Sequence, residues 1–132
     1  MPTSAAGMRD WAGSLGTWQA AMDDFRAIAL SLPEAVEQDH FGSPSFRVNG
    51  KIFAQLSADE LEGLCKLPLG VQEQVLLSFP DDSWPALHWG RYGWTCVKWR
   101  NLPVALNTDL LTQSWRAVAS RMLRETRDAT SE

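Results

Sequence analysis

The hydrophobic and polar positions of the chain change their period several times, which predicts a domain of mixed helices and strands. Apolar residues from Trp18 to Leu32 recur at the spacing of one helical face. We therefore expect a helix over 17–31, with Thr17 as its N-cap and Pro33 just beyond its end. Charged residues occupy the opposite side, so this helix is expected to pack on a sheet and to keep its polar side in solvent.

Residues 32–39 are polar and acidic, and we expect them to form an exposed connector without regular structure. Glu34 and Glu37 are close enough in the sequence to suggest a pair of carboxylates for acid–base chemistry. Their surroundings are polar, however, and nothing there would make one group an acid and the other a base. We therefore interpret both as solvated surface.

The strongest local signal is a β-hairpin over 45–56, with Asn49 and Gly50 at its turn. A type I′ turn requires positive φ at both central residues, and Asn-Gly is the pair that best tolerates it. Because a two-residue turn sets the register, we expect Phe46 to lie opposite Phe53. The other expected pairs are Val48 with Lys51 and Arg47 with Ile52.

Either face of this hairpin is apolar enough to be buried. One face carries Phe46 and Phe53, and the other carries Ile52, Ala54 and Leu56. Since successive side chains of a strand point to opposite sides, only one of these sets can face a core below a regular sheet. The pattern alone leaves both choices open.

A third strand and a second helix follow the hairpin. Residues 62–67 alternate as a strand would, which gives a three-stranded meander. Pro68 then suits the first turn of a helix over 68–79, because its missing N–H costs nothing there. The apolar face of this helix is expected to contain Val71, Val75, Leu76 and Phe79, and its solvent side Gln72, Glu73 and Gln74.

Residues 86–89 and 94–99 predict a second hairpin around the loop 90–93. The two glycines of this loop permit the positive φ values that a tight connection needs. Arg91 and Tyr92 would then lie at its tip. The short connection makes the two strands antiparallel neighbours in the same sheet.

The last predicted helix begins at Asn107 or Thr108, either of which can cap it. Its apolar stripe is expected to contain Leu111, Trp115, Val118 and Met122. Its C-terminal half carries Arg116, Arg121, Arg124 and Arg127. Basic side chains near a helix C-terminus are favourable on dipole grounds, which explains most of them without a ligand.

Together these elements predict one α+β domain, a two-layer α-β(3)-α-β(2)-α arrangement with one antiparallel five-stranded sheet. A chain of 132 residues is long enough for a single domain with a buried core. We expect a flexible lead-in over 1–16, the domain over 17–127 and a frayed C-terminus over 128–132. The lead-in lacks the apolar region of an export signal, and no segment is apolar enough to span a membrane. A cytoplasmic monomer without a membrane partner is therefore expected.

Candidate catalytic and metal-binding residues are few. Cys65 and Cys96 lie in predicted strands without the spacing of a metal site, so they are expected to pack as small apolar residues. His40 and His88 are isolated histidines of the kind that usually form structural hydrogen bonds. The sequence contains no nucleophile elbow, phosphate-binding loop or dinucleotide motif. We therefore expect no enzymatic activity, no cofactor and no metal.

The net charge of −4 is unevenly distributed. Residues 1–85 contain five Lys or Arg against twelve Asp or Glu, whereas residues 86–127 contain seven against two. The window 40–58 contains no acidic residue. Such an asymmetry suits a polyanionic partner, although charges at helix ends on a soluble surface explain it as well.

A longer motif carries a family resemblance. The segment 41–54 reads FGSPSFRVNGKIFA, and its marked positions are Phe41, Gly42, Pro44, Phe46, Gly50, Lys51 and Phe53. Lys66 opens the sequence KLP at the end of the third strand, Trp94 opens the sequence WTCV, and the sequence SWRAV occupies 114–118. On these residues the chain resembles the MmcQ/YjbR-like family of small bacterial proteins, over roughly residues 18–123.

The resemblance implies an α-β(3)-α-β(2)-α fold similar to that of the secretion chaperones. It implies no particular reaction. Members are often labelled DNA-binding, because their two hairpins were likened to a double wing. The function expected on this basis is a non-enzymatic module that binds DNA or another nucleic acid.

Two binding roles therefore remain. In a nucleic-acid module, basic side chains near the hairpins would contact phosphates and aromatic side chains would stack on single-stranded bases. The candidate residues are Arg47, Lys51, Arg91, Lys98, Arg100 and Tyr92, with Trp89 and Trp94 as further stacking candidates that also suit half-buried positions in the sheet. The alternative is a protein-interaction or chaperone-like module, in which exposed tryptophans such as Trp11, Trp84 and Trp89 would contact a partner.

Overall fold

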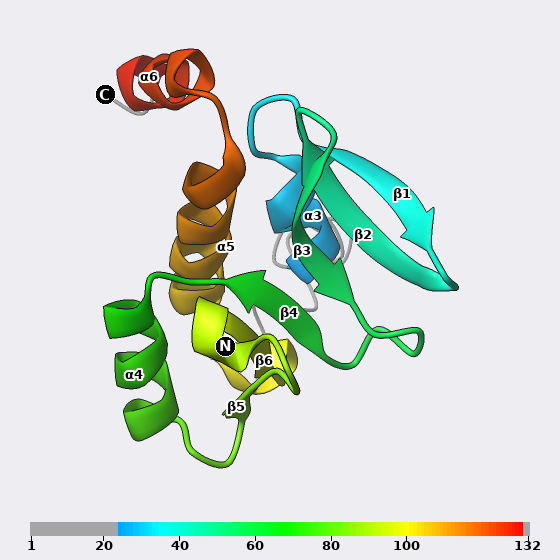
Figure 1. Ribbon diagram of the computed structural model, residues 1–132, viewed down its shortest axis with the longest axis vertical. Coiled ribbons are helices and arrows are strands. Elements are labelled where there is room, and N and C mark those ends of the chain that lie inside the picture. The colour runs from blue at the N-terminus through cyan, green and yellow to red at the C-terminus, as the bar shows by residue number, and fades with distance from the viewer. Residues whose placement is uncertain (1–23, 131–132) are drawn as a thin grey trace, which may run out of the picture.

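The computed structural model describes residues 24–130 and contains one antiparallel sheet with helices packed against it (Figure 1). Within these residues the strands are β1 (Val36–His40), β2 (Ser43–Val48), β3 (Lys51–Leu56), β4 (Gly63–Lys66), β5 (Ser83–Pro85) and β6 (Trp94–Val97). The helices are α3 (Phe25–Leu30), α4 (Leu69–Ser78), α5 (Val104–Val118) and α6 (Arg121–Thr130), with 3-10 turns η1 (Gly90–Tyr92) and η2 (Trp99–Asn101). The expected lead-in over 1–16 and the N-cap Thr17 lie outside the described residues.

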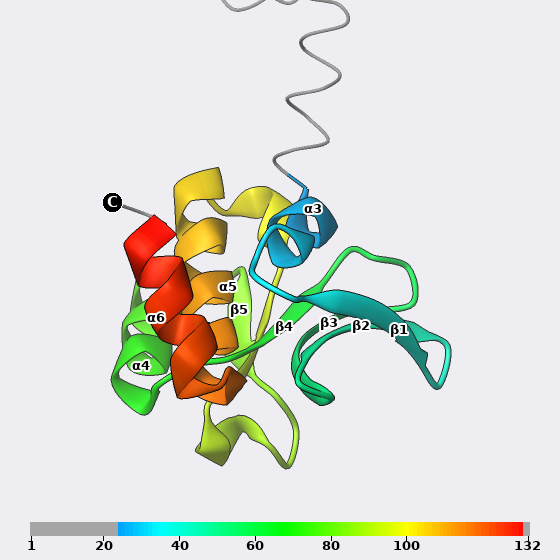
Figure 2. The ribbon, with the colours of Figure 1, turned by 90° about the horizontal axis from the view of Figure 1, so that it is seen from above.

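The strand order in the sheet is β1-β2-β3-β4-β6-β5, and all neighbours are antiparallel. Seen from above, α3 and α5 lie on one side of the sheet, and the yellow-green connection between β5 and β6 lies on the other (Figure 2). The predicted α+β class with one antiparallel sheet is therefore confirmed. The predicted strand number is wrong, because the described residues form six strands rather than five.

The additional strand is β1, which the sequence predicted as a connector. Its first four residues are exposed, so no apolar alternation marks it. Backbone pairing with β2 holds it, through a two-residue turn in which Phe41 and Gly42 have φ of 53° and 89°. Two positive φ values in succession are the signature of a type I′ turn. Phe rarely adopts this conformation, which is why the sequence did not indicate the hairpin.

The predicted hairpin of β2 and β3 is confirmed, with Asn49 and Gly50 at φ of 54° and 77°. Its register follows the prediction next to the turn, but a β-bulge places Phe46 opposite Ala54 and not opposite Phe53. Phe53 is the extra residue of the bulge, and all three of these side chains are fully buried. The bulge therefore lets two consecutive residues of β3 enter the same core. This resolves the choice between the two apolar faces.

Helix α5 closes the core against β3 and β4. Leu111 and Trp115 are fully buried at this contact. The indole Nε1 of Trp115 donates a hydrogen bond of 3.0 Å to the carbonyl oxygen of Pro33, which ties α5 to the segment after α3. Ser114 Oγ donates a hydrogen bond of 2.8 Å to the carbonyl oxygen of Lys66. The polar groups of Trp115 and Ser114 are thus hydrogen-bonded where they enter this contact.

Helix α4 agrees with its predicted range to within one residue at each end, with Pro68 as its N-cap. Gln72 was expected on the solvent side and is instead buried. Its Nε2 donates hydrogen bonds to the carbonyl oxygen of Gly90 at 2.9 Å and to Thr95 Oγ1 at 3.0 Å. These partners come from a distant part of the chain, so helical periodicity could not reveal that Gln72 faces inward.

The second hairpin differs from the prediction in its first strand. β5 covers Ser83–Pro85 rather than 86–89, so the connection to β6 extends over 86–93. Ser83 is also tied to α4, because its Oγ donates a hydrogen bond of 2.6 Å to the carbonyl oxygen of Phe79 at the end of that helix. A strand of three residues is too short for its alternation to be recognised in the sequence.

The last predicted helix starts earlier than expected. Helix α5 begins at Val104 after Pro103, so neither Asn107 nor Thr108 is its cap. Asn107 is buried instead, and its Nδ2 donates a hydrogen bond of 2.8 Å to the carbonyl oxygen of Trp99. The capping preference of Asn is therefore overridden by a tertiary hydrogen bond.

The same predicted helix is also interrupted. The backbone becomes extended at Ala119, and Ser120 Oγ accepts the N–H of Leu123 at 3.3 Å as α6 begins. Met122 was expected in the apolar stripe but is 76% exposed. Arg121, Arg124 and Arg127 consequently belong to α6, while Arg116 stays on α5. Helix α6 continues to Thr130, past the residues at which we expected fraying to begin.

Arg26 joins three segments of the chain. Its Nε lies 2.9 Å from Glu37 Oε1 on β1, and its Nη1 lies 2.8 Å from Glu60 Oε1 in the turn after β3. The hydrogen bonds from Arg26 hold the pKa of Glu60 below its usual range, and the two carboxylates raise the pKa of Arg26. Glu37 is thus an ion-pair partner and not simply solvated surface.

Replacement of Gly93 by Ala is expected to destabilise the fold. Gly93 has a φ of +99°, and a Cβ there would collide with the carbonyl oxygen of Leu67. We expect Gly93→Ala to lower the free energy of unfolding by roughly 2–4 kcal/mol, measured by urea denaturation. Gly70→Ala is the control, because a Cβ at Gly70 meets no atom within 4 Å. Equal effects of the two substitutions would contradict the close approach at Gly93.

The ion pair of Arg26 and Glu60 is expected to stabilise the fold near neutral pH but not in acid. Because folding lowers the pKa of Glu60, the contribution is present above the ordinary Glu pKa and is lost as the pH falls through the lowered value. Glu60→Gln should lower the melting temperature near neutral pH and should match the wild type once the pH has fallen through the lowered pKa of Glu60. Glu73→Gln, at an exposed position of α4, is the control. A deficit for Glu60→Gln that did not change with pH would argue against this role.

Candidate functional site

Helices α3, α4 and α5 pack on one face of the sheet, and we call the opposite one the open face. Residues directly opposite each other in paired strands project to the same side. The buried row towards the helices contains Phe46, Ala54, Cys65 and Thr95. The alternate row, on the open face, contains Gln38, Ser45, Gln55, Leu64, Cys96 and Trp84. By the same alternation, His40, Arg47, Ile52, Lys66 and Trp94 also face the open side.

A hollow of about 310 Å³ lies on the open face. It is lined by His40, Ile52, Gln55, Leu64, Trp89 and Trp94. Trp94 is half-buried, as expected, whereas Trp89 is 60% exposed because it lies in the connection after β5 and not in a strand. The hollow therefore combines an apolar floor with two indole rings and a few polar groups, a lining suited to flat or apolar ligand groups.

The charged side chains that the strands project to this face are cationic. Arg47 is half-buried, with its Nε 3.2 Å from Ser45 Oγ and its Nη2 3.3 Å from Nδ1 of His40. Lys66 follows on β4. Among the described strands, no residue that projects to the open face is Asp or Glu. Glu62 lies just before β4, at the margin of this face.

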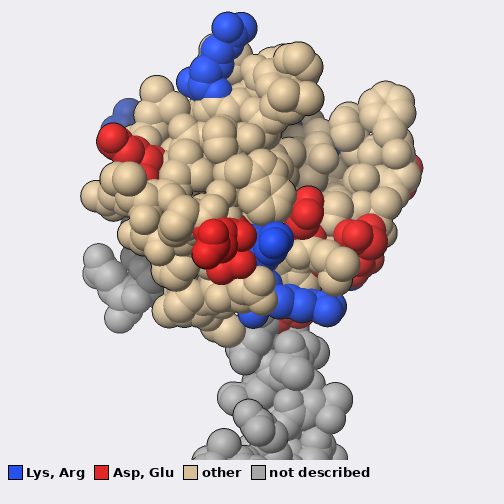
Figure 3. All heavy atoms as spheres, turned by 90° about the horizontal axis from the view of Figure 1, so that it is seen from below, with Lys and Arg blue, Asp and Glu red and all other residues tan. Residues whose placement is uncertain are grey.

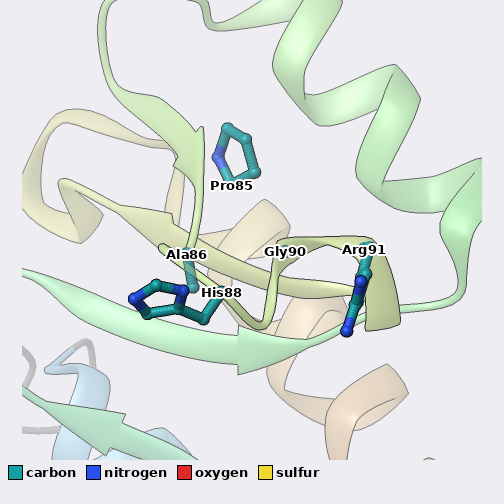
Figure 4. A pocket seen from close by; sticks show the side chains of 5 residues that line it. All are labelled: Pro85, Ala86, His88, Gly90 and Arg91. Carbon is teal, nitrogen blue, oxygen red and sulfur yellow. The ribbon is translucent and has the colours of Figure 1, made fainter.

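The connection between β5 and β6 forms a further hollow of about 380 Å³. Its lining residues are Pro85, Ala86, His88, Gly90 and Arg91 (Figure 4). The side chains of His88 and Arg91 lie on either side of Gly90 in this view. The residue type at Gly90 is constrained, because a Cβ there would lie 2.6 Å from Cβ of Pro85.

This connection is held by contacts within it and by α4. The buried Gln72 binds the carbonyl oxygen of Gly90, and the Trp94 carbonyl accepts the N–H of Ala86 at 2.9 Å. The guanidinium of Arg91 lies 4.9 Å from the ring centroid of Tyr92, a cation–π distance. The backbone of the connection is therefore held by the core, and it carries the exposed aromatic and cationic side chains of Tyr92 and Arg91.

The structure separates the six residues predicted to contact nucleic acid. Arg47 lies on the open face beside the hollow, and Lys51 is exposed at the turn of its hairpin. Arg91 and Tyr92 are exposed on η1. Lys98 and Arg100 follow β6 and line a different depression, together with Leu61, Glu62 and Asn101. The six residues therefore do not form one continuous patch.

The surroundings of Arg100 are mixed in charge. Its guanidinium lies 4.9 Å from the ring centroid of Trp99, and its charge helps to lower the pKa of Glu60. Viewed from below, the molecule shows basic and acidic groups side by side, and broad uncharged areas cover the rest of this face (Figure 3). On the described part of this end of the molecule, basic side chains form no continuous area.

Sequence reasoning missed part of the open-face site. His40 was interpreted as structural, and Ile52, Gln55 and Leu64 were not considered as contact residues. The alternation in β4 did show that Leu64 and Lys66 share a side, opposite Gly63 and Cys65. The alternation could not show which side of the sheet the helices cover. It therefore grouped Leu64 with Lys66 but did not tell whether this side is the core or the exposed face.

Phe41 is the most unusual exposed residue of the structure. Its side chain is 95% exposed although it is a large apolar ring. Its φ of 53° is costly for a residue with a bulky side chain, by roughly 1–2 kcal/mol. The ring stands edge-on to His40, with centroids 4.7 Å apart and an interplanar angle of 68°. Phe41 therefore extends the aromatic surface of the open face to the end of the β1–β2 hairpin.

Most of the remaining motif residues have structural roles. Gly42 and Gly50 occupy positive-φ positions of the two hairpin turns, and Phe46 and Phe53 are fully buried. Pro44 lies in β2 and is half-buried. Lys66 and Trp94 are direct cross-strand partners on the open face. The motif thus specifies turns and core at most positions, and a surface at its ends.

The cysteines behave as packing residues. Burial raises the pKa of the Cys65 thiol to about 12 and also raises that of Cys96, so neither is a thiolate at neutral pH. Among residues 24–130, no group of three His, Cys, Asp or Glu side chains is placed to hold a metal ion. Within the same residues, every helix is too short or too polar to cross a membrane.

Comparison with known proteins identifies the relatives of this fold. A solved structure from Deinococcus radiodurans, protein DR2400 with a DUF419 domain, is similar with a TM-score of 0.67 and 22% sequence identity. The similarity covers 80% of this chain and 86% of the other. No curated protein sequence matches significantly. The family model of YjbR matches residues 30–117, which include the sheet and most of α5, and the chain therefore belongs to the YjbR family.

Proposed function

We propose that this protein binds nucleic acid on the open face of its sheet. The observation that supports this most is the chemistry of that face. The indoles of Trp89 and Trp94 line one hollow, and Arg47 and Lys66 are the cross-strand partners of Ile52 and Trp94, which also line it. Basic side chains that follow a backbone, combined with aromatic platforms for bases, are the general means of binding single-stranded nucleic acid.

The proposed contacts follow from the two kinds of side chain. Arg47 and Lys66 contact phosphate oxygens, with Lys51 at the turn as a further cation. Bases lie against Trp89 and Trp94, which have space for them because the hollow is open. The negative net charge of the protein does not oppose this arrangement, because no described strand residue on the open face is acidic.

A protein partner is the second candidate for the same face. It is favoured by the large apolar side chains that are exposed there and on the neighbouring connection, notably Phe41, Leu87 and Trp89. Contiguous exposed apolar groups are typical of interaction sites. The absence of catalytic activity expected from the sequence stays a prediction, as does binding through Lys98 and Arg100.

The proposal predicts salt-dependent binding that depends on Lys66 and Trp89. Fluorescence anisotropy of a labelled single-stranded oligonucleotide should show binding that weakens steeply between about 50 and 200 mM salt. Lys66→Gln should weaken binding and reduce the slope of log K against log salt by about 1, because one phosphate contact is lost. Trp89→Ala should weaken binding roughly tenfold, because a stacking platform is lost.

Arg121→Gln is the matched control, because it removes the same charge from α6, where Arg121 is exposed and forms an ion pair with Glu125 one turn further along the helix. It should leave affinity and salt slope nearly unchanged. Equal effects of Lys66→Gln and Arg121→Gln would show that net charge and not the open face governs binding. No binding at the lower salt concentration would refute the proposal and would favour a protein partner.

A further inference from the structure

We propose that Phe41 is a base-stacking residue at the end of the open face, and that the site takes single-stranded rather than double-stranded nucleic acid. This inference rests on the proposed function and specifies its substrate class and one contact. Three observations carry it: the exposure of the ring, its backbone conformation, and its position beside His40.

Neither burial nor turn formation accounts for Phe at this position. The ring is 95% exposed, so it contributes almost nothing to the core. Its φ of 53° belongs to the first central position of a type I′ turn, where Asn, Asp or Gly would be favoured. A bulky aromatic residue that is both exposed and conformationally unfavourable is best explained by a contact with a molecule outside the chain.

The position of Phe41 connects it to the hollow. Its ring is 4.7 Å from that of His40, and His40 lines the hollow together with Trp89 and Trp94. Nδ1 of His40 is 3.3 Å from Nη2 of Arg47. Aromatic rings thus lie at the tip and within the hollow, with a guanidinium close to the histidine between them. A single-stranded nucleic acid likewise has bases that can contact the rings and phosphates that can contact the guanidinium.

The aromatic groups discriminate between single and double strands. Bases in a duplex are stacked on each other and expose mainly their edges, whereas bases of a single strand can be splayed onto protein rings. Phe41, Trp89 and Trp94 offer ring faces or edges and few hydrogen-bonding groups. The contact is therefore expected to be tolerant of sequence and selective for strandedness.

The test compares Phe41→Asn and Phe41→Tyr with the wild type, using oligothymidylates of about three and about twelve nucleotides and a duplex of similar length. Asn suits a positive φ, so Phe41→Asn should melt at the same temperature as the wild type or higher. It should nevertheless bind the longer single strand roughly tenfold more weakly. Phe41→Tyr keeps the ring and should bind like the wild type.

The outcomes separate the two levels of the proposal. If the wild type binds the longer single strand and Phe41→Asn binds it equally well, Phe41 is not a contact and this inference is overturned, while the proposed function stands. Duplex binding as tight as single-strand binding would overturn the assigned substrate class. If the wild type binds none of the three probes, the proposed function itself fails, and this inference fails with it.

Discussion

The packing of α5 on β3 and β4 is the contact on which the other features depend. It buries Leu111 and Trp115 completely, and it determines which face of the sheet becomes the core. The same contact positions the open face, because Ser114 of α5 binds the backbone of Lys66, whose side chain projects to the other side. Strand β4 thus contributes one set of side chains to the core and the alternate set to the candidate site.

The bulge at Phe53 has consequences for both faces. It brings both Phe53 and Ala54 into the core beside Phe46, and it shifts the register so that Gln55 lies opposite Ser45 on the open face. Bulges also bend a strand and increase its twist. The curvature of β2 and β3 is visible in Figure 2. A hollow lined by residues from β1, β3, β4 and β6 is a natural consequence of such a curved sheet.

Strand alternation also explains how an acidic protein can carry a basic, aromatic face. On β1, Glu37 and Asp39 project to one side and Gln38 and His40 to the other. Glu37 meets Arg26 on the helix side, so its charge is compensated away from the open face. The net charge of the chain is therefore a poor guide to the local field, because the pleat of the sheet separates groups that are adjacent in sequence.

The sequence by itself determined the elements whose signals are local. The Asn49-Gly50 turn, the strands β3 and β4, helix α4 and the α+β class follow from turn chemistry and periodicity, and the motif around that turn identified the family. Only the tertiary structure decided the edge strand β1, which is held by pairing rather than burial, the inward position of Gln72, and the side of the sheet that α5 covers. It likewise decided that Arg47, Lys66 and Trp89 share one surface while Lys98 and Arg100 do not. These properties depend on contacts between residues far apart in the chain, and a single sequence contains no local signal for them.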